Sequence, residues 1–292
     1  MHAPKITIVT PSFNQANYLE ETIRSVIEQQ YPNLEYIIID GGSTDGSVDI
    51  IKKYAAHLAY WVSEPDAGQT SAINKGFGRA TGDVVAYLNS DDLYLPGSLA
   101  AIAGEFSSRN CQWIAGACSF FGTDRTYYEN RRPPFFRARW FDHCPLAQPA
   151  VFWRRCLFSR YGYLDESLHY SMDYDFWLRL IVGGERCHYL NKPLAAFRWH
   201  DESKTITQES AFAEEDRIIK ERHFVQLPAF EHILAKHFTR VGESKLGFAR
   251  ASSLREAGRR RDGLTCFAGT ILKYPPSILT RAFLTTATRV LS

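Results

Sequence analysis

The chain has 292 residues, of which 45% are hydrophobic and 23% charged, and its formal net charge is +2. This composition excludes a disordered or fibrous protein and predicts a soluble globular protein with a full-sized core. From Glu231 to Ser292, eleven basic residues stand against four acidic ones, so this end either contacts an anionic partner or is a solvated helical surface. Because no nucleic-acid-binding module accompanies the basic residues, no nucleic acid is expected as a partner.

The first third of the chain alternates between apolar runs and segments with apolar residues at helical spacing. The runs predict buried strands at residues 5–10, 36–40, 58–63 and 83–88. The intervening segments predict helices over residues 18–30, through Val48, Ile51 and Tyr54, and over residues 70–79. This order is typical of an α/β fold with an open, mostly parallel sheet and helices on both faces.

The C-terminal part of the chain has a helical pattern. Residues 244–272 predict a helical hairpin, and residues 278–291 predict a final amphipathic helix that carries Phe283 and Leu284 beside arginines. Such a helix either packs on its own domain or lies on a membrane surface, and the pattern leaves both open. We therefore expect a helical C-terminal extension over residues 204–292.

Two adjacent carboxylates, Asp91 and Asp92, follow the apolar run that ends at Leu88. In an open α/β sheet, ligands bind beyond the carboxyl ends of the strands. Mg²⁺ is usually held by one or two carboxylates together with substrate phosphates. The pair therefore indicates a metal-bridged phosphate site, although an Asp-Asp turn before the helix that begins near Pro96 would have the same sequence.

Four further motifs accompany the acidic pair. They are Thr10–Asn14 after the first strand, Asp40 at the end of the second, Met172–Arg179, and Phe197–His200. With Asp91 and Asp92 they closely resemble family 2 glycosyltransferases of the GT-A fold, over residues 5–203. The segments at residues 64–76 and 88–92 are similar to the branch of this family that builds bacterial surface polysaccharides, such as O-antigen or exopolysaccharide.

The resemblance implies a GT-A domain over residues 1–203, with a nucleotide-binding half at 1–95 and an acceptor-binding half at 96–203. It implies transfer, with inversion, from a nucleotide-diphosphate sugar to a hydroxyl of a saccharide or lipid-linked acceptor. The reaction would use a divalent metal, Mn²⁺ or Mg²⁺, as a Lewis acid at the leaving diphosphate.

The resemblance also assigns roles to individual residues around the donor. Asp92 would be the main metal ligand, with Asp91 contacting the ion or the ribose and His200 completing the diphosphate site. The other residues implied to bind the nucleotide are Pro11, Phe13, Asp40, Asp66 and Asn74. Asp40 is also compatible with a turn-forming role, and Asn74 with that of an ordinary helical polar residue.

Asp173 matches the family's general base, which takes the proton from the acceptor hydroxyl. Met172 stands where the family has a glutamate, and Asp175 is the alternative base. Gln148 falls where the acceptor subsite begins, with Trp153 nearby as a candidate for stacking on a sugar, although most aromatic residues at such spacing are core residues.

Two other functions remain open from the sequence: a sugar nucleotidyltransferase, and a noncatalytic module that binds nucleotide sugars. The first normally grips a triphosphate with a Gly-rich turn, which Ser12–Gln15 lacks. The absence of a signal peptide or membrane span leads us to expect a cytoplasmic protein. The basic C-terminal region would allow peripheral contact with the anionic inner face of the cell membrane.

Overall fold

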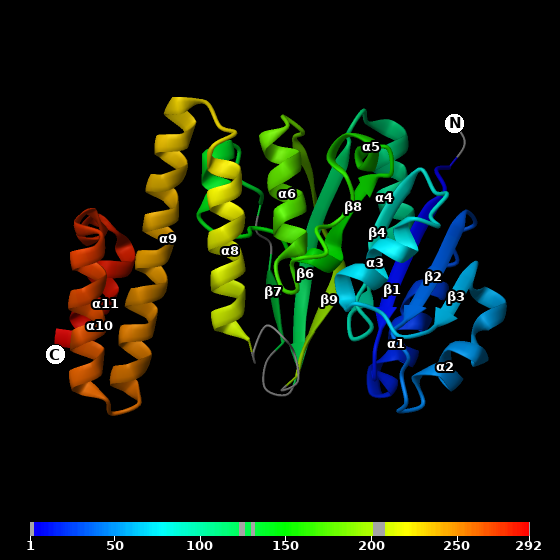
Figure 1. Ribbon diagram of the computed structural model, residues 1–292, viewed down its shortest axis with the longest axis horizontal. Coiled ribbons are helices and arrows are strands. Elements are labelled where there is room, and N and C mark those ends of the chain that lie inside the picture. The colour runs from blue at the N-terminus through cyan, green and yellow to red at the C-terminus, as the bar shows by residue number, and fades with distance from the viewer. Residues whose placement is uncertain (1–2, 123–125, 130–131, 201–207, 292) are drawn as a thin grey trace. The chain divides into compact units, whose positions relative to one another are not determined.

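The computed structural model describes residues 3–122, 126–129, 132–200 and 208–291 (Figure 1). The chain forms two compact units: unit 1 comprises residues 1–133 and 145–219, and unit 2 comprises residues 134–144 and 220–292. The domain boundary expected at residue 203 lies outside the described residues and stays a prediction.

Unit 1 is built on a nine-stranded sheet with strand order β3-β2-β1-β4-β8-β6-β9-β5, in which β7 pairs with β6. The strands that precede residue 90 pair in parallel, which confirms the predicted sheet. β8 joins β4 and β6 in antiparallel fashion, whereas β9 runs parallel to β6. The strands are β1 Ile6–Ser12, β2 Leu34–Asp40, β3 Tyr60–Ser63, β4 Val84–Tyr87, β5 Leu93–Tyr94, β6 Trp113–Gly122, β7 Tyr127–Glu129, β8 Val151–Arg154 and β9 Cys187–Trp199.

The predicted helices of the first third are present, each displaced by no more than a few residues at its ends. Those of unit 1 are α1 Ala16–Ile27, α2 Ser47–Lys53, α3 Gln69–Phe77, α4 Ser98–Ser108, α5 Leu157–Tyr161 and α6 Met172–Val182, with the 3₁₀ turns η1 Ala55–His57 and η3 Gln148–Ala150. Helix α8, Glu209–Phe224, begins in unit 1 and ends in unit 2.

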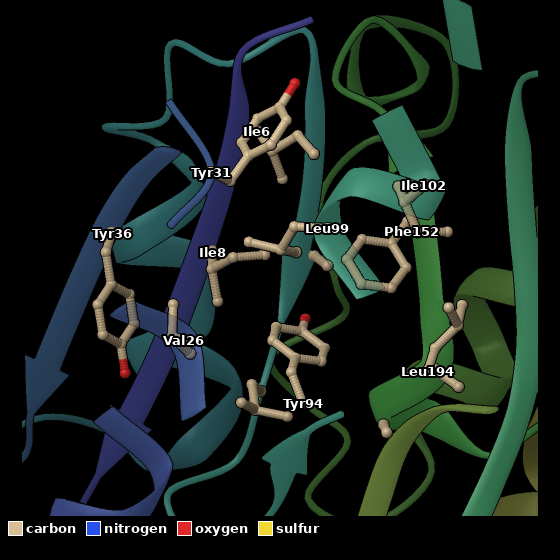
Figure 2. Close-up of a cluster of buried hydrophobic side chains, with 14 of the residues drawn as sticks. Ile6, Ile8, Val26, Tyr31, Tyr36, Tyr94, Leu99, Ile102, Phe152 and Leu194 are labelled. Atoms are coloured by element: carbon tan, nitrogen blue, oxygen red, sulfur yellow. The ribbon is translucent and has the colours of Figure 1, made fainter. Parts of the chain in front are cut away.

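Alternation along β1 divides the core of unit 1 into two layers, because successive side chains of a strand point to opposite faces. Ile6 and Ile8 pack against side chains of α1 and α4, among them Val26 and Leu99 (Figure 2). Val9 faces α3, which approaches so closely that a Cβ atom on Gly76 would lie 2.4 Å from the Cγ1 atom of Val9. Helices therefore cover both faces of the sheet, as predicted.

Unit 2 is helical. Its elements are η2 Arg137–Phe141, the end of α8, α9 Ala229–Glu256, α10 Arg260–Lys273, η4 Pro275–Leu279 and α11 Arg281–Leu291. The predicted hairpin is confirmed as α9 and α10, although α9 starts earlier than expected. Phe248 on α9, Phe267 on α10 and Phe283 on α11 contact one another in a small core. No helix among the described residues combines the length and apolar content that a membrane-spanning helix requires.

Candidate active site at the carboxyl edge of the sheet

The carboxyl ends of β1, β2 and β3 meet at one edge, where Ser12 pairs with Asp40 and Asp40 pairs with Ser63. The Asp40 carboxylate is fully buried. Its Oδ2 atom accepts hydrogen bonds from the backbone of Gly42 and Ser43, at 3.1 and 2.9 Å, and from the Ser63 hydroxyl at 2.7 Å. Its Oδ1 atom accepts one from the Ser43 hydroxyl at 2.5 Å. Asp40 thus shapes the turn after β2, and contact with a nucleotide base stays a prediction.

The loop after β1 is fastened to this turn. The Asn14 backbone donates to the Ser43 hydroxyl at 2.8 Å, and the Asn14 side chain accepts from the Thr44 backbone at 2.9 Å. Pro11 is buried in β1, whereas the Phe13 ring beside it is 61% exposed. Phe13 therefore presents an accessible aromatic face at the carboxyl edge, as the predicted base pocket requires.

The acidic pair lies in the loop between β4 and β5. Asp92 is 1% exposed, and its Oδ1 atom accepts a hydrogen bond from the Arg198 backbone at 3.0 Å. Its Oδ2 atom is buried and has no hydrogen-bond partner among the residues that the structure describes. Burial, and next the charge of Asp91, raise the pKa of Asp92 well above its ordinary value. A buried carboxylate oxygen without a partner is costly, and a bound cation would satisfy it.

His200 lies beside the acidic pair, as expected, with its Nε2 atom 3.0 Å from the Oδ2 atom of Asp91. The His200 ring packs on the Tyr18 ring of α1, with 4.7 Å between centroids. The Arg198 guanidinium lies 5.1 Å from the Tyr18 ring and donates to the Asp91 carbonyl at 3.0 Å. The Thr22 hydroxyl of α1 donates to the Asp92 carbonyl at 2.8 Å, so α1 is bonded directly to the acidic loop.

These residues fit a metal that is shared with a substrate. The described residues contain no group of three or more His, Cys, Asp or Glu side chains arranged to hold an ion. A metal bound by all-protein ligands is therefore not indicated. The unpartnered oxygen of Asp92, next to Asp91, provides the one or two carboxylates that suffice when phosphate oxygens complete the coordination.

Helix α3 ties the acidic loop to the segment that precedes α6. The Gln69 side chain donates to Asn89 at 2.8 Å, just before the acidic pair. The next residue, Thr70, donates to the Leu168 carbonyl at 2.7 Å. Gln148 also joins the acidic loop, because its Oε1 atom lies 3.4 Å from the Asn89 amide nitrogen. The structure therefore brings Gln148 to the same edge of the sheet as the acidic pair.

Two of the expected nucleotide-binding residues have structural partners. Asp66 accepts a hydrogen bond from the Gly68 backbone at 2.8 Å and lies against Gly41, directly after Asp40. Asn74 donates to the Leu164 carbonyl at 2.8 Å and accepts from the Leu164 backbone at 3.1 Å. Asn74 therefore fastens the loop that contains Leu164 to α3, and its contact with a nucleotide stays a prediction.

Asp173 lies in the first turn of α6 and is partly exposed. Its Oδ1 atom accepts a hydrogen bond from the Tyr174 backbone at 2.8 Å. Desolvation of the carboxyl group by the surrounding protein atoms raises the pKa of Asp173 to about 6. The Tyr174 hydrogen bond opposes this shift, and the negative charges of Asp216 and Glu215 add to it. A carboxylate with a pKa close to neutral is a suitable general base.

Asp175, the alternative base, is 1% exposed and its Oδ2 atom accepts from Arg179 Nε at 2.9 Å. The Arg179 guanidinium also donates to the carbonyls of Tyr161 and Tyr163. Asp175 therefore belongs to a buried ion pair that fixes the end of α5. This environment favours Asp173 as the base.

Trp153 lies in β8 and is fully buried. Its ring contacts the rings of Phe77, Phe176 and Trp177, with centroids 5.3–5.4 Å away. The structure gives no support to Trp153 as a residue that stacks on the acceptor sugar, because its ring is part of the aromatic core.

The fold and this edge define a glycosyltransferase of the GT-A type. The model of the family "Glycosyl transferase family 2" matches residues 7–177, more than half of the chain. The chain belongs to this family and is a glycosyltransferase. This assignment decides against a sugar nucleotidyltransferase and against a noncatalytic binding module.

Relatives from several bacteria are similar to this chain. An uncharacterised glycosyltransferase of Mycobacterium tuberculosis is 34% identical over 184 residues, which cover 61% of this chain and 69% of the relative. The putative teichuronic acid biosynthesis glycosyltransferase TuaG of Bacillus subtilis is 35% identical over 128 residues, which cover 42% of this chain and only 50% of TuaG.

Solved structures share the fold. S. aureus TarS 1–349 in complex with UDP-GlcNAc superposes with a TM-score of 0.65 at 17% identity, over 94% of this chain and 81% of that one. A mannosyltransferase from Pyrobaculum calidifontis, in complex with GDP-Man and Mn²⁺, superposes with a TM-score of 0.57 at 18% identity, over all of this chain and 88% of that one.

Proposed function

We propose that this enzyme transfers a sugar, with inversion, from a nucleotide-diphosphate sugar to a hydroxyl of a saccharide or lipid-linked acceptor. The observation that carries the proposal is the buried, unpartnered Oδ2 atom of Asp92 beside Asp91 at the carboxyl edge of the parallel strands. The nucleotide sugars bound by TarS 1–349 and by the Pyrobaculum mannosyltransferase support this class of donor.

A divalent cation, Mn²⁺ or Mg²⁺, would be held by Asp92 and Asp91 together with the donor diphosphate, and His200 would complete the diphosphate site. When bound, it would neutralise negative charge at the leaving diphosphate. Asp91 and His200 are already paired, which orients both groups toward one another before any donor binds. Mn²⁺ in the Pyrobaculum complex supports a metal of this kind.

Side chains of the enzyme itself would bind the donor, contact the acceptor and remove the proton of its hydroxyl. Phe13 would stack on the base, with Pro11 and the turn formed by Asp40 shaping the pocket. Asp173 would accept the proton of the attacking hydroxyl, whose oxygen forms the new bond while the bond to the nucleoside diphosphate breaks. A single displacement with one base inverts the anomeric centre. Gln148, which reaches the acidic loop, would contact the acceptor.

The acceptor and its location are a further part of the proposal. TuaG, whose name places it in teichuronic acid biosynthesis, supports an acceptor in a cell-surface polysaccharide. In unit 2, Leu272 and Leu279 are 80% and 84% exposed, and the exposed Lys273 and Arg281 flank them. Apolar side chains among basic ones suit an anionic membrane surface, where a lipid-linked acceptor would be presented.

A panel of UDP- and GDP-sugars, assayed for release of nucleoside diphosphate with Mn²⁺, with Mg²⁺ and with EDTA, tests the proposal. We expect one donor to be consumed only when a divalent cation is present, and Asp92→Asn to abolish this turnover. Asp49→Asn, which changes an exposed carboxylate of α2 that pairs with Lys52, is the matched control. Full turnover in EDTA would contradict the metal, and equal anomeric configuration in donor and product would contradict inversion.

A further inference from the structure

Helix α8 supplies a carboxylate that accepts three consecutive backbone N–H groups directly before α6. The Glu215 Oε1 atom accepts from His169 at 2.7 Å, and its Oε2 atom accepts from Tyr170 and Ser171 at 2.9 and 2.8 Å. Charge-assisted bonds of this kind are short and strong. One side chain therefore fixes the path of the chain for three residues, ending two residues before Asp173.

The next residue of α8, Asp216, binds the residue that precedes the first turn of α6. Ser171 is the N-cap residue of α6, but its hydroxyl makes no capping bond within α6. It donates instead to the Asp216 Oδ1 atom at 2.7 Å. Since an N-cap hydroxyl normally satisfies a backbone N–H of its own helix, this serine serves the contact with α8.

We propose that Glu215 and Asp216 are positioning residues of the transfer reaction: they fix the first turn of α6 and so place the Asp173 carboxylate against the acceptor hydroxyl. This inference rests on the proposed role of Asp173 as general base. Neither residue needs to contact a substrate. Both act through the segment from His169 to Ser171, which they hold by four hydrogen bonds.

The charges of the two acids give the arrangement a second effect. Glu215 and Asp216 oppose ionisation of Asp173, because like charges disfavour one another. The nearby acid on α6 itself, Asp175, is paired with Arg179. The charged groups of α8 therefore help keep the pKa of Asp173 near neutral, where a base still accepts a proton readily.

The experiment compares three isosteric variants of the 292-residue chain. Asp216→Asn keeps an oxygen for the Ser171 hydroxyl but removes the charge, and Glu215→Gln removes the other charge. Glu214→Gln is the control, because Glu214 lies on the same helix but pairs with the exposed Arg217. The midpoint of Asp173 is read by ¹³C NMR titration of labelled aspartate, and its signal is assigned by its loss in Asp173→Asn.

We expect Asp216→Asn and Glu215→Gln each to lower the Asp173 midpoint by about 0.5 unit or more, and Glu214→Gln to leave it unchanged. With the donor found in the panel, Glu215→Ala should lower kcat by about tenfold or more at an unchanged KM for the donor, and Glu215→Gln should restore part of the loss. Equal midpoints in all three variants, or a loss confined to KM, would overturn the proposal. Full transfer by Asp173→Asn would instead show that Asp173 is not the general base. The NMR titration would still show whether Glu215 and Asp216 shift the midpoint of Asp173.

Discussion

The His200 Nε2 atom lies 3.0 Å from the Oδ2 atom of Asp91, although 109 residues separate the two in the chain. β9 brings them together: it pairs with β5, which directly follows the acidic loop, and its last residues continue to His200. The Tyr18 ring of α1 contacts the imidazole ring of His200. The candidate metal site is therefore assembled from the first helix, the acidic loop and the end of the last strand of the sheet.

Asp92→Asn is expected to abolish the gain in nucleoside diphosphate affinity that Mn²⁺ provides. The asparagine side chain keeps an oxygen for the Arg198 backbone but loses the charge that faces the cation. Isothermal titration of UDP and GDP, with and without Mn²⁺, measures the effect, and thermal unfolding checks that the variant is folded. A variant that retains the metal-dependent gain would show that Asp92 is not a ligand.

Asp173→Asn should reduce transfer by about 10²–10⁴-fold and leave donor affinity nearly unchanged, as expected for the loss of a general base. In the wild type, the raised pKa of Asp173 leaves the carboxyl group half ionised at a pH of about 6 and mostly ionised above it. Transfer should therefore rise with pH through that value and level off above it. A pH profile of kcat/KM, which reports the free enzyme, measures this limb, and a profile that falls as pH rises through 6 would exclude Asp173 as the base.

The N-terminal half of the fold could be predicted because its signals are local. The apolar run that ends at Asp40 specifies a buried parallel strand, and polar residues at strand ends mark the ligand-binding edge. The pairing of β6 with β9 joins distant segments, so no local pattern reveals it. Only the family resemblance indicated that His200 would lie beside Asp91.

Three residues show where sequence reasoning fails at the site. Trp153 was a candidate for sugar stacking, but an aromatic residue in a strand has the same sequence signature whether it faces the core or a ligand. Glu215 and Asp216 were missed because acidic residues on a polar helix usually face solvent. Their role depends on a tertiary contact with the segment before α6, which the sequence does not display.

Asp175→Asn should lower the stability of the protein rather than its rate of transfer. The change leaves the Arg179 guanidinium, whose side chain is 19% exposed, without its ionic partner, and we expect a loss of about 3 kcal/mol in the free energy of unfolding. Denaturant unfolding followed by tryptophan fluorescence measures it. Asp49→Asn, which removes an exposed ion pair with Lys52, should cost no more than about 0.5 kcal/mol. If Asp175→Asn is fully stable and loses transfer, the role of base moves to Asp175.

The final prediction concerns the proposed membrane contact of unit 2. The basic cluster and the exposed apolar residues lie apart in the structure: Arg259, Arg260 and Arg261 lie at the start of α10, and Leu272 lies at its other end, about 20 Å away by helix rise. Phe283 packs in the helical core, so it does not face a membrane. The contact would therefore be made by Leu272 and by the segment after α10, with its flanking cations.

Co-sedimentation with vesicles that contain phosphatidylglycerol tests this surface. We expect binding that weakens as salt rises, because each basic residue near an anionic leaflet contributes about 1 kcal/mol and salt screens it. Leu279→Asp should remove most of the binding, because it places a negative charge among the exposed apolar side chains. Leu246→Asp, at a residue of α9 that is 69% exposed, should bind as the wild type does. Equal losses in both variants, or binding that ignores lipid charge, would leave these helices with a packing role alone.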